Sequence, residues 1–218
     1  MKKIICLILA LVCVVACASC NNSGESQNPI LGNKGTLETV RDTVNNSSPT
    51  RIVTRTEYVG KETLEAMYTT QIDRESGKSQ FDFKYERYAT VEEMLAGSIK
   101  TVEGTVYYNA DGSVSSSDGE SWDSKDTLTY LPENLNLEEI GFKSYEIVDN
   151  GNDLKGYIAS SDSKRVFGSK IDADGDIMLE IDTNGMYLYN IKITYTAKDT
   201  GATVVVNTSY DYSAVTIA

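Results

Sequence analysis

Histidine is absent from the chain, and its four cysteines all lie within the first twenty residues. Without imidazole, histidine acid–base chemistry and the Ser-His and Cys-His nucleophile pairs are excluded. The same absences remove the side chains that hold zinc in most protein sites. The sequence therefore predicts a protein that is not an enzyme and that holds no metal or cofactor.

Basic residues are also few, with 20 Lys and Arg against 32 Asp and Glu and a formal net charge of -12. Removal of a leader that carries Lys2 and Lys3 would move the charge to -14. Nucleic acids and anionic bilayers attract proteins through clusters of lysine and arginine. The composition therefore argues against a nucleic-acid partner and against attachment to a membrane by charge.

The one long apolar run is at the N-terminus, where Lys2 and Lys3 precede residues 4–15. That run is too short to span a bilayer as a helix, and the pattern is typical of an export signal. The cysteines Cys6, Cys13, Cys17 and Cys20 lie in or directly behind it. The folded part therefore has no disulfide.

The segment Val14-Val15-Ala16-Cys17 resembles the lipobox of bacterial lipoproteins, in which the cysteine receives the lipid. We predict a signal peptide over residues 1–16 and lipidation, palmitate included, at Cys17, with Cys20 as the competing site. A plain secretory cleavage near Ala18-Ser19 is the remaining alternative. The domain is then exported and held outside the cytoplasm on the bacterial cell membrane by its lipid anchor.

Residues 17–35 read as a flexible tether, because residues 21–35 are polar and rich in turn formers. A flexible chain of this length reaches roughly 20 Å. Residues 36–218 form a single predicted domain, and its length is sufficient for a hydrophobic core.

The domain begins with one amphipathic helix, for which Thr36 is the expected cap and Leu37, Val40 and Val44 form the apolar stripe. The chain after Pro49 alternates between apolar and polar residues, as strands do. Strands are predicted over residues 51–59, 62–73, 79–88, 99–108, 145–148, 154–160 and 164–171, and short helices over 90–97 and 135–140.

The C-terminal part carries the clearest alternation. The inward residues of its last two strands are expected to be Tyr187, Tyr189, Ile191, Ile193, Tyr195, Val204, Val206, Thr208, Tyr210 and Tyr212. A four-residue loop over residues 198–201 would pair Tyr195 with Val204, Ile193 with Val206, and Tyr189 with Tyr210.

The strand before this pair places Ile177, Leu179 and Ile181 on the same face. Because odd positions share this face in both strands, the loop between them must have an odd number of residues. Thr183-Asn184-Gly185 fits as a three-residue turn with Gly185 in the left-handed region. A two-residue turn would place Ile181 opposite Leu188 and mix the faces.

About ten strands joined by short loops favour a single long antiparallel meander with one wet face. Twist bends such a sheet. The predicted fold class is mainly antiparallel β (α+β), an open half-barrel with one or two short helices covering the concave face.

The concave face is the candidate ligand cavity. Its predicted lining is Tyr187, Tyr189, Ile191, Ile193, Tyr195, Val204, Val206, Tyr210 and Tyr212. Tyrosine has an apolar ring and a hydroxyl that needs a partner, so the four at one end of the face, Tyr187, Tyr189, Tyr210 and Tyr212, suit a half-wet rim. An ordinary core edge and the lip of an apolar ligand cavity both fit this pattern.

This layout resembles the lipoprotein-carrier superfamily, which includes the lipoprotein-localisation factors LolA and LolB and the lipid-carrier lipoproteins LppX and LprG. Ser117-Asp118-Gly119-Glu120-Ser121-Trp122 followed by Tyr130-Leu131-Pro132 is similar to an Asp-Gly-x-x-Trp and Tyr-x-Pro run in that family. The resemblance implies a half-barrel closed by a helix, with an apolar cavity for acyl chains and no catalytic residue.

Acidic segments offer three weaker alternatives. Asp172, Asp174 and Asp176 imitate part of a calcium loop, but the glycine is one position early and a strand follows, so a solvated turn is favoured. Residues 115–122 are similar to a single Asp-box, for which a turn around Trp122 is the simpler interpretation. A carboxylate-pair glycosidase would have to use Glu120 and Asp123.

Three functions are thus in competition. The first is an envelope-anchored lipoprotein that binds or carries a lipid, an acyl chain or another apolar small molecule. The second is a non-catalytic surface lipoprotein with a filled core that acts through protein partners of unknown identity. The third is a hydrolase that uses carboxylates alone.

Overall fold

The computed structural model describes residues 34–60, 63–87, 91–117, 135–148, 152–168 and 170–217. The chain divides into two units, Met1–Leu31 and Gly32–Ala218, and the description below concerns the second. The predicted leader with Cys17 and Cys20, the tether up to residue 33, and the segment with Glu120, Trp122 and Asp123 lie outside the described residues.

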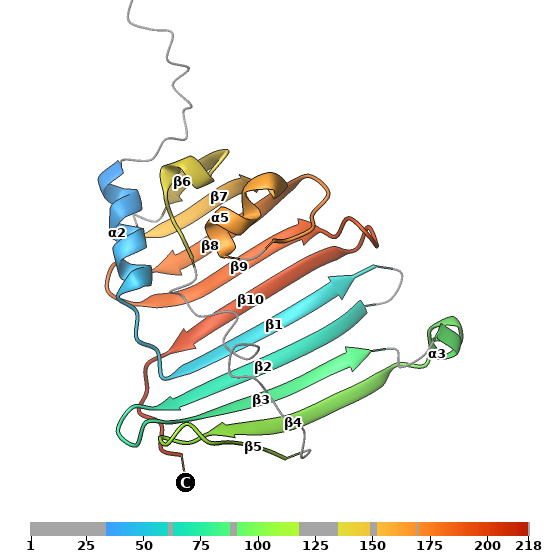
Figure 1. Ribbon diagram of the computed structural model, residues 1–218. Helices are drawn as coiled ribbons and strands as arrows, with labels where there is room; N and C mark the ends of the chain where they lie inside the picture. Colours follow the sequence, from blue (N-terminus) through green and yellow to red (C-terminus); the bar gives the residue numbers. More distant parts are fainter. Residues whose placement is uncertain are drawn as a thin grey trace, which may run out of the picture. The chain divides into compact units, whose positions relative to one another are not determined.

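The described residues form one sheet of ten strands with short helices beside it (Figure 1). The strands are β1 (Arg51–Val59), β2 (Thr63–Asp73), β3 (Lys78–Arg87), β4 (Lys100–Tyr108), β5 (Val114–Ser116), β6 (Ser144–Val148), β7 (Asp153–Ala159), β8 (Asp176–Thr183), β9 (Leu188–Thr196) and β10 (Thr203–Asp211). The helices are α2 (Lys34–Asn45), α3 (Val91–Leu95) and α5 (Ser163–Phe167), with the 3₁₀ turns η2 (Glu139–Gly141) and η4 (Ser160–Asp162).

The order of the strands differs from a meander in chain order. It runs β5-β4-β3-β2-β1-β10-β9-β8-β7-β6, with every neighbouring pair antiparallel. The first and last strands pair along nine residues, from Arg51 opposite Asp211 to Val59 opposite Thr203. Two local meanders therefore join through β1 and β10, and β5 and β6 form the two edges.

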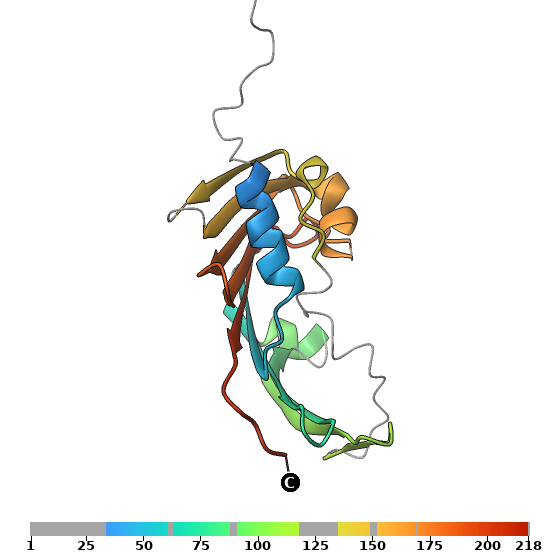
Figure 2. The same cartoon turned by 90° about the vertical axis from the view of Figure 1, so that its left-hand side faces the viewer.

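The predicted fold class is confirmed, because the sheet is mainly antiparallel, single-layered and not closed into a barrel. Figure 2 shows that it bends, with α2 and α5 on the concave side. Figure 1 looks onto that concave face and places both helices over the β6–β10 half.

The main core fills the concave side of this half. Leu37, Val40 and Val44 of α2 are buried at the predicted helical spacing. They belong to one cluster with the inward residues of β6 to β10, the start of β1, and Val166 and Phe167 of α5. The helix begins at Lys34, two residues before the predicted cap Thr36.

The last hairpin matches two of its three predicted pairs. The third, Tyr189 with Tyr210, is not formed, because the pairing ends at Asn190 opposite Ser209, and Tyr189 is exposed whereas Tyr210 is buried. Tyr195 lies opposite Val204 and Ile193 opposite Val206. The backbone N–H of Gly201 donates to the carbonyl of Ala197 at 2.8 Å and closes the loop over residues 198–201.

The predicted turn between β8 and β9 is wrong in its length. Ile181 lies opposite Ile191, and the connection covers residues 184–187, with Gly185 at a left-handed φ of 79°. Asp182 pairs with Asn190 but Thr183 pairs with Leu188, so Tyr189 is an extra residue. This bulge turns Leu188 into the core and Tyr189 outward, the opposite of the predicted alternation.

The Tyr212 hydroxyl pairs with the backbone groups of Leu188 beside the bulge. It donates to the carbonyl of Leu188 at 2.8 Å and accepts from the N–H of the same residue at 3.1 Å. The hydroxyl also lies 3.3 Å from Oγ of Ser47, which follows the C-terminal end of α2 in the chain. One phenol thus satisfies both backbone groups of Leu188 and connects the hairpin to the helix end.

Two other predicted elements need correction, and one strand was not predicted. Residues 164–171 were expected to form a strand, but Ser163, Val166 and Phe167 are buried at helical spacing in α5, which ends at Gly168 with a φ of 69°. Within residues 135–140, only the start of η2 is helical. The short edge strand β5 is serine-rich and lacks the apolar alternation that would have predicted it.

Asp73 ties the C-terminal tail to the turn between β2 and β3. Its buried carboxylate accepts from the N–H groups of Glu75 and Ser76 at 3.0 and 3.1 Å and from that of Ile217 at 3.2 Å. The Ser76 hydroxyl and these N–H groups lower the pKa of Asp73 from 3.8 to about 2.

We expect Tyr212→Phe to lower the free energy of unfolding by about 1–3 kcal/mol, because it leaves partly buried backbone groups without a partner. Tyr189→Phe is the matched control, since the exposed Tyr189 hydroxyl only accepts from Asn184 at 2.8 Å. Urea unfolding curves measure both variants. Equal losses in the two variants would contradict the role given to Tyr212.

The Asp73 carboxylate should make stability depend on pH. Because its folded-state pKa is depressed, its contribution is complete above the ordinary value of 3.8 and is lost as the pH falls toward about 2. Asp73→Asn should therefore be less stable than the parent at neutral pH, and the difference should shrink across this interval. Urea midpoints measured from neutral to acidic pH test this, and a constant difference would count against it.

Candidate functional site

The concave face changes character along the sheet. Over β6 to β10 it is aliphatic and packed against α2 and α5. Over β2 to β4 a second, separate cluster contains the buried Phe81, Phe83 and Val106, with partly buried Tyr68, Tyr85, Val102 and Tyr108 around it. The second cluster has no residue on β1 or β10, whereas Ile52 of β1 and Val204, Val206 and Tyr210 of β10 belong to the first.

Aromatic rings form a continuous row in the second cluster. Tyr68 stacks on Phe81 with ring centroids 5.9 Å apart and the planes at 10°. Phe83 follows at 6.1 Å from Phe81, and Tyr85 at 6.1 Å from Phe83. The period-two alternation of β3 puts Phe81, Phe83 and Tyr85 on one face, so the row follows the strand.

The absence of a side chain at Gly104 leaves room for the Phe83 ring. Gly104 lies opposite Phe83 on β4, and a Cβ at this position would lie 2.6 Å from the ring. A larger residue would therefore have to displace Phe83. The glycine lets the ring lie flat against the neighbouring strand.

A strip of short side chains separates the aliphatic and aromatic halves. The strip consists of Thr54, Thr56, Ala66 and Thr208, all buried. The register brings them together, since Thr54 lies opposite Thr208 on one side, and Thr56 lies opposite Ala66 on the other. Threonine hydroxyls are thus held in the middle of an otherwise apolar surface.

The hydroxyls of this strip are not equivalent. The Thr54 and Thr208 hydroxyls share a hydrogen bond of 3.1 Å. The Thr56 side chain is only 3% exposed, and its hydroxyl has no hydrogen-bond partner among the described residues. Because a buried polar group without a partner costs free energy, Thr56 is a position where a bound polar atom would be stabilising.

The nine residues predicted to line a cavity are not all brought together. Ile191, Ile193, Val204, Val206 and Tyr210 are buried in the aliphatic cluster, and Tyr195 and Tyr212 pack against it. Tyr187 and Tyr189 are 42% and 47% exposed. Tyr187 still contacts the Tyr212 ring, at 4.7 Å between centroids, but the bulge turns Tyr189 away from the core.

The helices fill the aliphatic half, where many side chains have no exposed surface. The short-side-chain strip lies beside the aliphatic half, mainly on β1 and β2. It contains the unpartnered Thr56 hydroxyl. The apolar–polar alternation predicted strands over residues 62–73 and 79–88 but no site on them. The β1–β10 pairing, which brings Thr54 and Thr56 beside the core, was the missing information.

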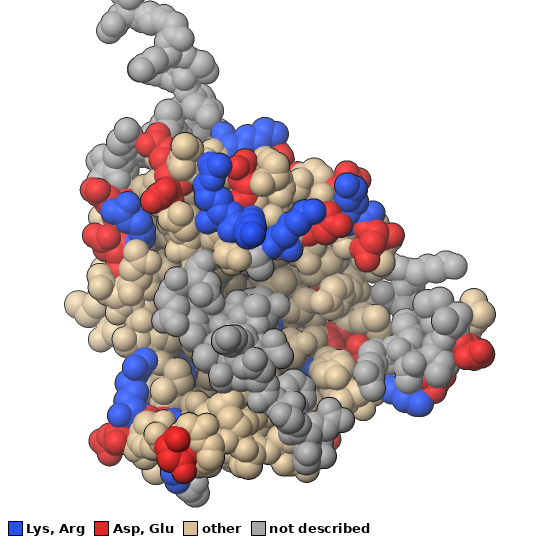
Figure 3. All heavy atoms as spheres, viewed as in Figure 1, with Lys and Arg blue, Asp and Glu red and all other residues tan. Residues whose placement is uncertain are grey.

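The aromatic row and the short-side-chain strip contain no charged residue within the described part of the chain. Figure 3 shows lysine, arginine and acidic side chains along the upper and lower rims of this face. Burial raises the pKa of Tyr210, and burial with the nearby Glu139 raises that of Tyr145. These phenols therefore stay neutral at physiological pH.

No group of three or more metal-binding side chains occurs among the described residues. Asp172, Asp174 and Asp176 are exposed, and Glu180 instead lies near Lys192 and Lys155, at 3.3 and 3.8 Å. In the described part of the chain, each helix is too short or too polar to cross a bilayer.

Comparison with known proteins yields no relative: no protein-family model and no curated protein sequence matches the chain.

Proposed function

We propose that this protein is an envelope-anchored lipoprotein that binds a lipid, an acyl chain or another apolar small molecule on the concave face of its half-barrel. The unpartnered Thr56 hydroxyl carries the proposal, because it gives the uncharged strip between the two clusters a buried polar group that a polar ligand atom would satisfy. Export and lipidation at Cys17, or at Cys20, belong to the same proposal and rest on the leader sequence.

The proposed ligand lies across the short-side-chain strip. Its apolar part contacts the partly exposed rings of Tyr68 and Tyr85, which lie at the two ends of the aromatic row. Its polar group accepts from or donates to Thr56, while Thr54 and Thr208 satisfy each other. This arrangement suits an amphiphile with one polar group better than a pure hydrocarbon.

One observation favours a second candidate. The aliphatic half of the concave face is filled by α2 and α5, as expected for a surface lipoprotein that has no cavity and acts through protein partners. The edge strands β5 and β6 would then offer backbone groups to a partner. A ligand bound over the strip separates the first candidate from the second.

Thr56→Val tests the ligand site, since valine has the shape of threonine without the hydroxyl. Without ligand, the variant should be as stable as the parent or about 1 kcal/mol more stable, because an unpartnered buried hydroxyl is removed. Thr54→Val is the control and should lose stability, because it breaks the bond to Thr208.

Native mass spectrometry of the full chain, extracted in mild detergent, measures the ligand. The parent should carry a non-covalent mass that disappears on denaturation, and Thr56→Val should retain about tenfold less of it, a loss of roughly 1.4 kcal/mol. A parent without any such mass, or equal retention in the parent and Thr56→Val, would remove the ligand proposal and leave the second candidate.

Lipid attachment is tested separately by metabolic labelling with a palmitate analogue. We expect label on the full chain and in Cys20→Ser, loss of label in Cys17→Ser, and release of the Cys17→Ser protein from the membrane fraction. A reversed pattern would assign the lipid to Cys20. Label in neither the parent nor the variants would favour plain secretion.

A further inference from the structure

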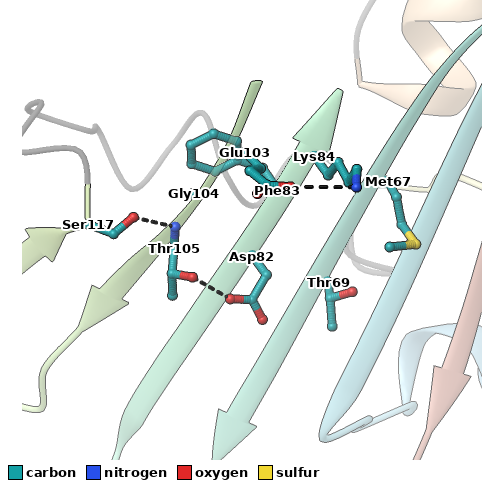
Figure 4. Close-up of a pocket in the computed structure, with 9 residues that line it drawn as sticks. All are labelled: Met67, Thr69, Asp82, Phe83, Lys84, Glu103, Gly104, Thr105 and Ser117. Atoms are coloured by element: carbon teal, nitrogen blue, oxygen red, sulfur yellow. Dashed lines mark hydrogen bonds and ion pairs between the residues drawn. The ribbon is translucent and has the colours of Figure 1, made fainter. Parts of the chain in front are cut away.

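The convex face carries two neighbouring hollows over β2, β3 and β4, on the opposite side of the sheet from the proposed lipid site. The first has a volume of about 380 Å³ and is lined in part by Met67, Asp82, Lys84, Glu103, Thr105 and Ser117 (Figure 4). The second has a volume of about 420 Å³ and includes Lys78, Gln80, Tyr107, Asn109, Ser115 and Ile217. Both volumes fall within the usual size of small-molecule sites, roughly 300–1,000 Å³.

The two hollows are neighbours because of the strand register. Asp82 lies opposite Thr105, and Gln80, two residues along the same face, lies opposite Tyr107. The hollows therefore follow β3 and β4 end to end. Ile217 lies at the far end, where the Asp73 carboxylate holds the tail through a bond of 3.2 Å.

Hydrogen bonds fix the polar groups between the hollows. Asp82 Oδ1 accepts from the Thr105 hydroxyl at 2.8 Å, and Gln80 Nε2 donates to Asp82 at 2.9 and 3.0 Å (Figure 4 shows the first of these bonds). Ser117 Oγ accepts from the N–H of Thr105 at 2.9 Å, which leaves its own proton available to a ligand. A carboxylate accepts up to about four hydrogen bonds, so Asp82 retains acceptor capacity.

Charge in the lining is balanced although the whole chain has a formal charge of -12. Asp82 and Glu103 are matched by Lys78 and Lys84, and Lys84 lies 3.5 Å from Glu103. A balanced set of donors and acceptors does not favour an ion of either sign. It suits a neutral molecule with many hydroxyl groups.

The second hollow is also lined by an aromatic ring. Tyr107 is 39% exposed and lines the second hollow beside Gln80. The face of an exposed tyrosine ring offers an apolar plane at the protein surface. The C–H groups on one face of a sugar ring pack against such a plane, while the sugar hydroxyls point outward to polar neighbours.

We propose that this convex face binds a neutral oligosaccharide, with one sugar ring on Tyr107 and the next ring along the chain held by Asp82, Thr105 and Ser117. The two hollows lie in line, so the ligand is a linear chain of two or more sugars. The site uses outward residues of β3 and β4, whereas the lipid proposal uses inward residues of β1, β2 and β3, so either proposal can fail alone.

Isothermal titration of the full chain with neutral linear hexasaccharides tests the proposal. The probes are maltohexaose, cellohexaose, xylohexaose, mannohexaose and laminarihexaose, with the anionic hexagalacturonate for comparison. At least one neutral probe should bind with a Kd below roughly 1 mM. No binding by any neutral probe, or tighter binding of hexagalacturonate than of every neutral probe, would overturn the proposal.

Tyr107→Ala should weaken binding of that probe about tenfold or more, as expected for the loss of a ring contact. Tyr157→Ala is the matched control, since Tyr157 is also 39% exposed and projects from β7 on the same convex side. Asp82→Asn preserves the shape of the side chain and should weaken binding several-fold. Equal effects of the two tyrosine variants would overturn the assignment, and unchanged urea midpoints would confirm that all variants are folded.

Discussion

The pairing of β1 with β10 is the contact on which the rest of the sheet depends. The other strand pairs join neighbours along the chain, whereas this one joins the first strand to the last along nine residues. It places Ile52 beside Tyr210 in the aliphatic cluster and Thr54 beside Thr208 in the strip between the clusters. Because loop-closure entropy opposes such a long-range contact, its stability depends on the burial of these side chains.

Two glycines let aromatic rings cover the ends of the concave face. A Cβ on Gly104 would lie 2.6 Å from Phe83, and a Cβ on Gly156 would lie 2.5 Å from the Phe142 ring. Gly104 belongs to the aromatic half, and Gly156 lies on β7 beneath the aliphatic half. In each half, the absence of a side chain on one strand is compensated by a ring from a neighbouring segment, which keeps the strand shielded from water.

The local alternation of apolar and polar residues predicted most of the strands, but it did not predict that the two halves of the sheet join through β1 and β10. The boundaries of β1 and the register of the β9–β10 hairpin follow from alternation and loop length, both of which are local. The bulge at Tyr189 could not be predicted this way, because the backbone of Leu188 is satisfied by Tyr212, which lies 24 residues later, just after β10. The candidate site differs from the predicted one for the same reason. No local sequence pattern marks Thr56, which lies beside the core only because β1 pairs with β10.

The two faces of the β3–β4 pair are nearly separate surfaces built from alternating residues. Asp82 projects to the convex side between Phe81 and Phe83, which pack on the concave side. The separation is weakest at Gly104, which has no side chain: the Phe83 ring lies against it, and Ser117 Oγ would be 3.2 Å from its Cβ. That same Ser117 oxygen accepts from the N–H of Thr105. The backbone of β4 at Gly104 and Thr105 is therefore the shared wall of the aromatic row and the convex hollow, so displacement of Phe83 would be transmitted to the polar face at this point.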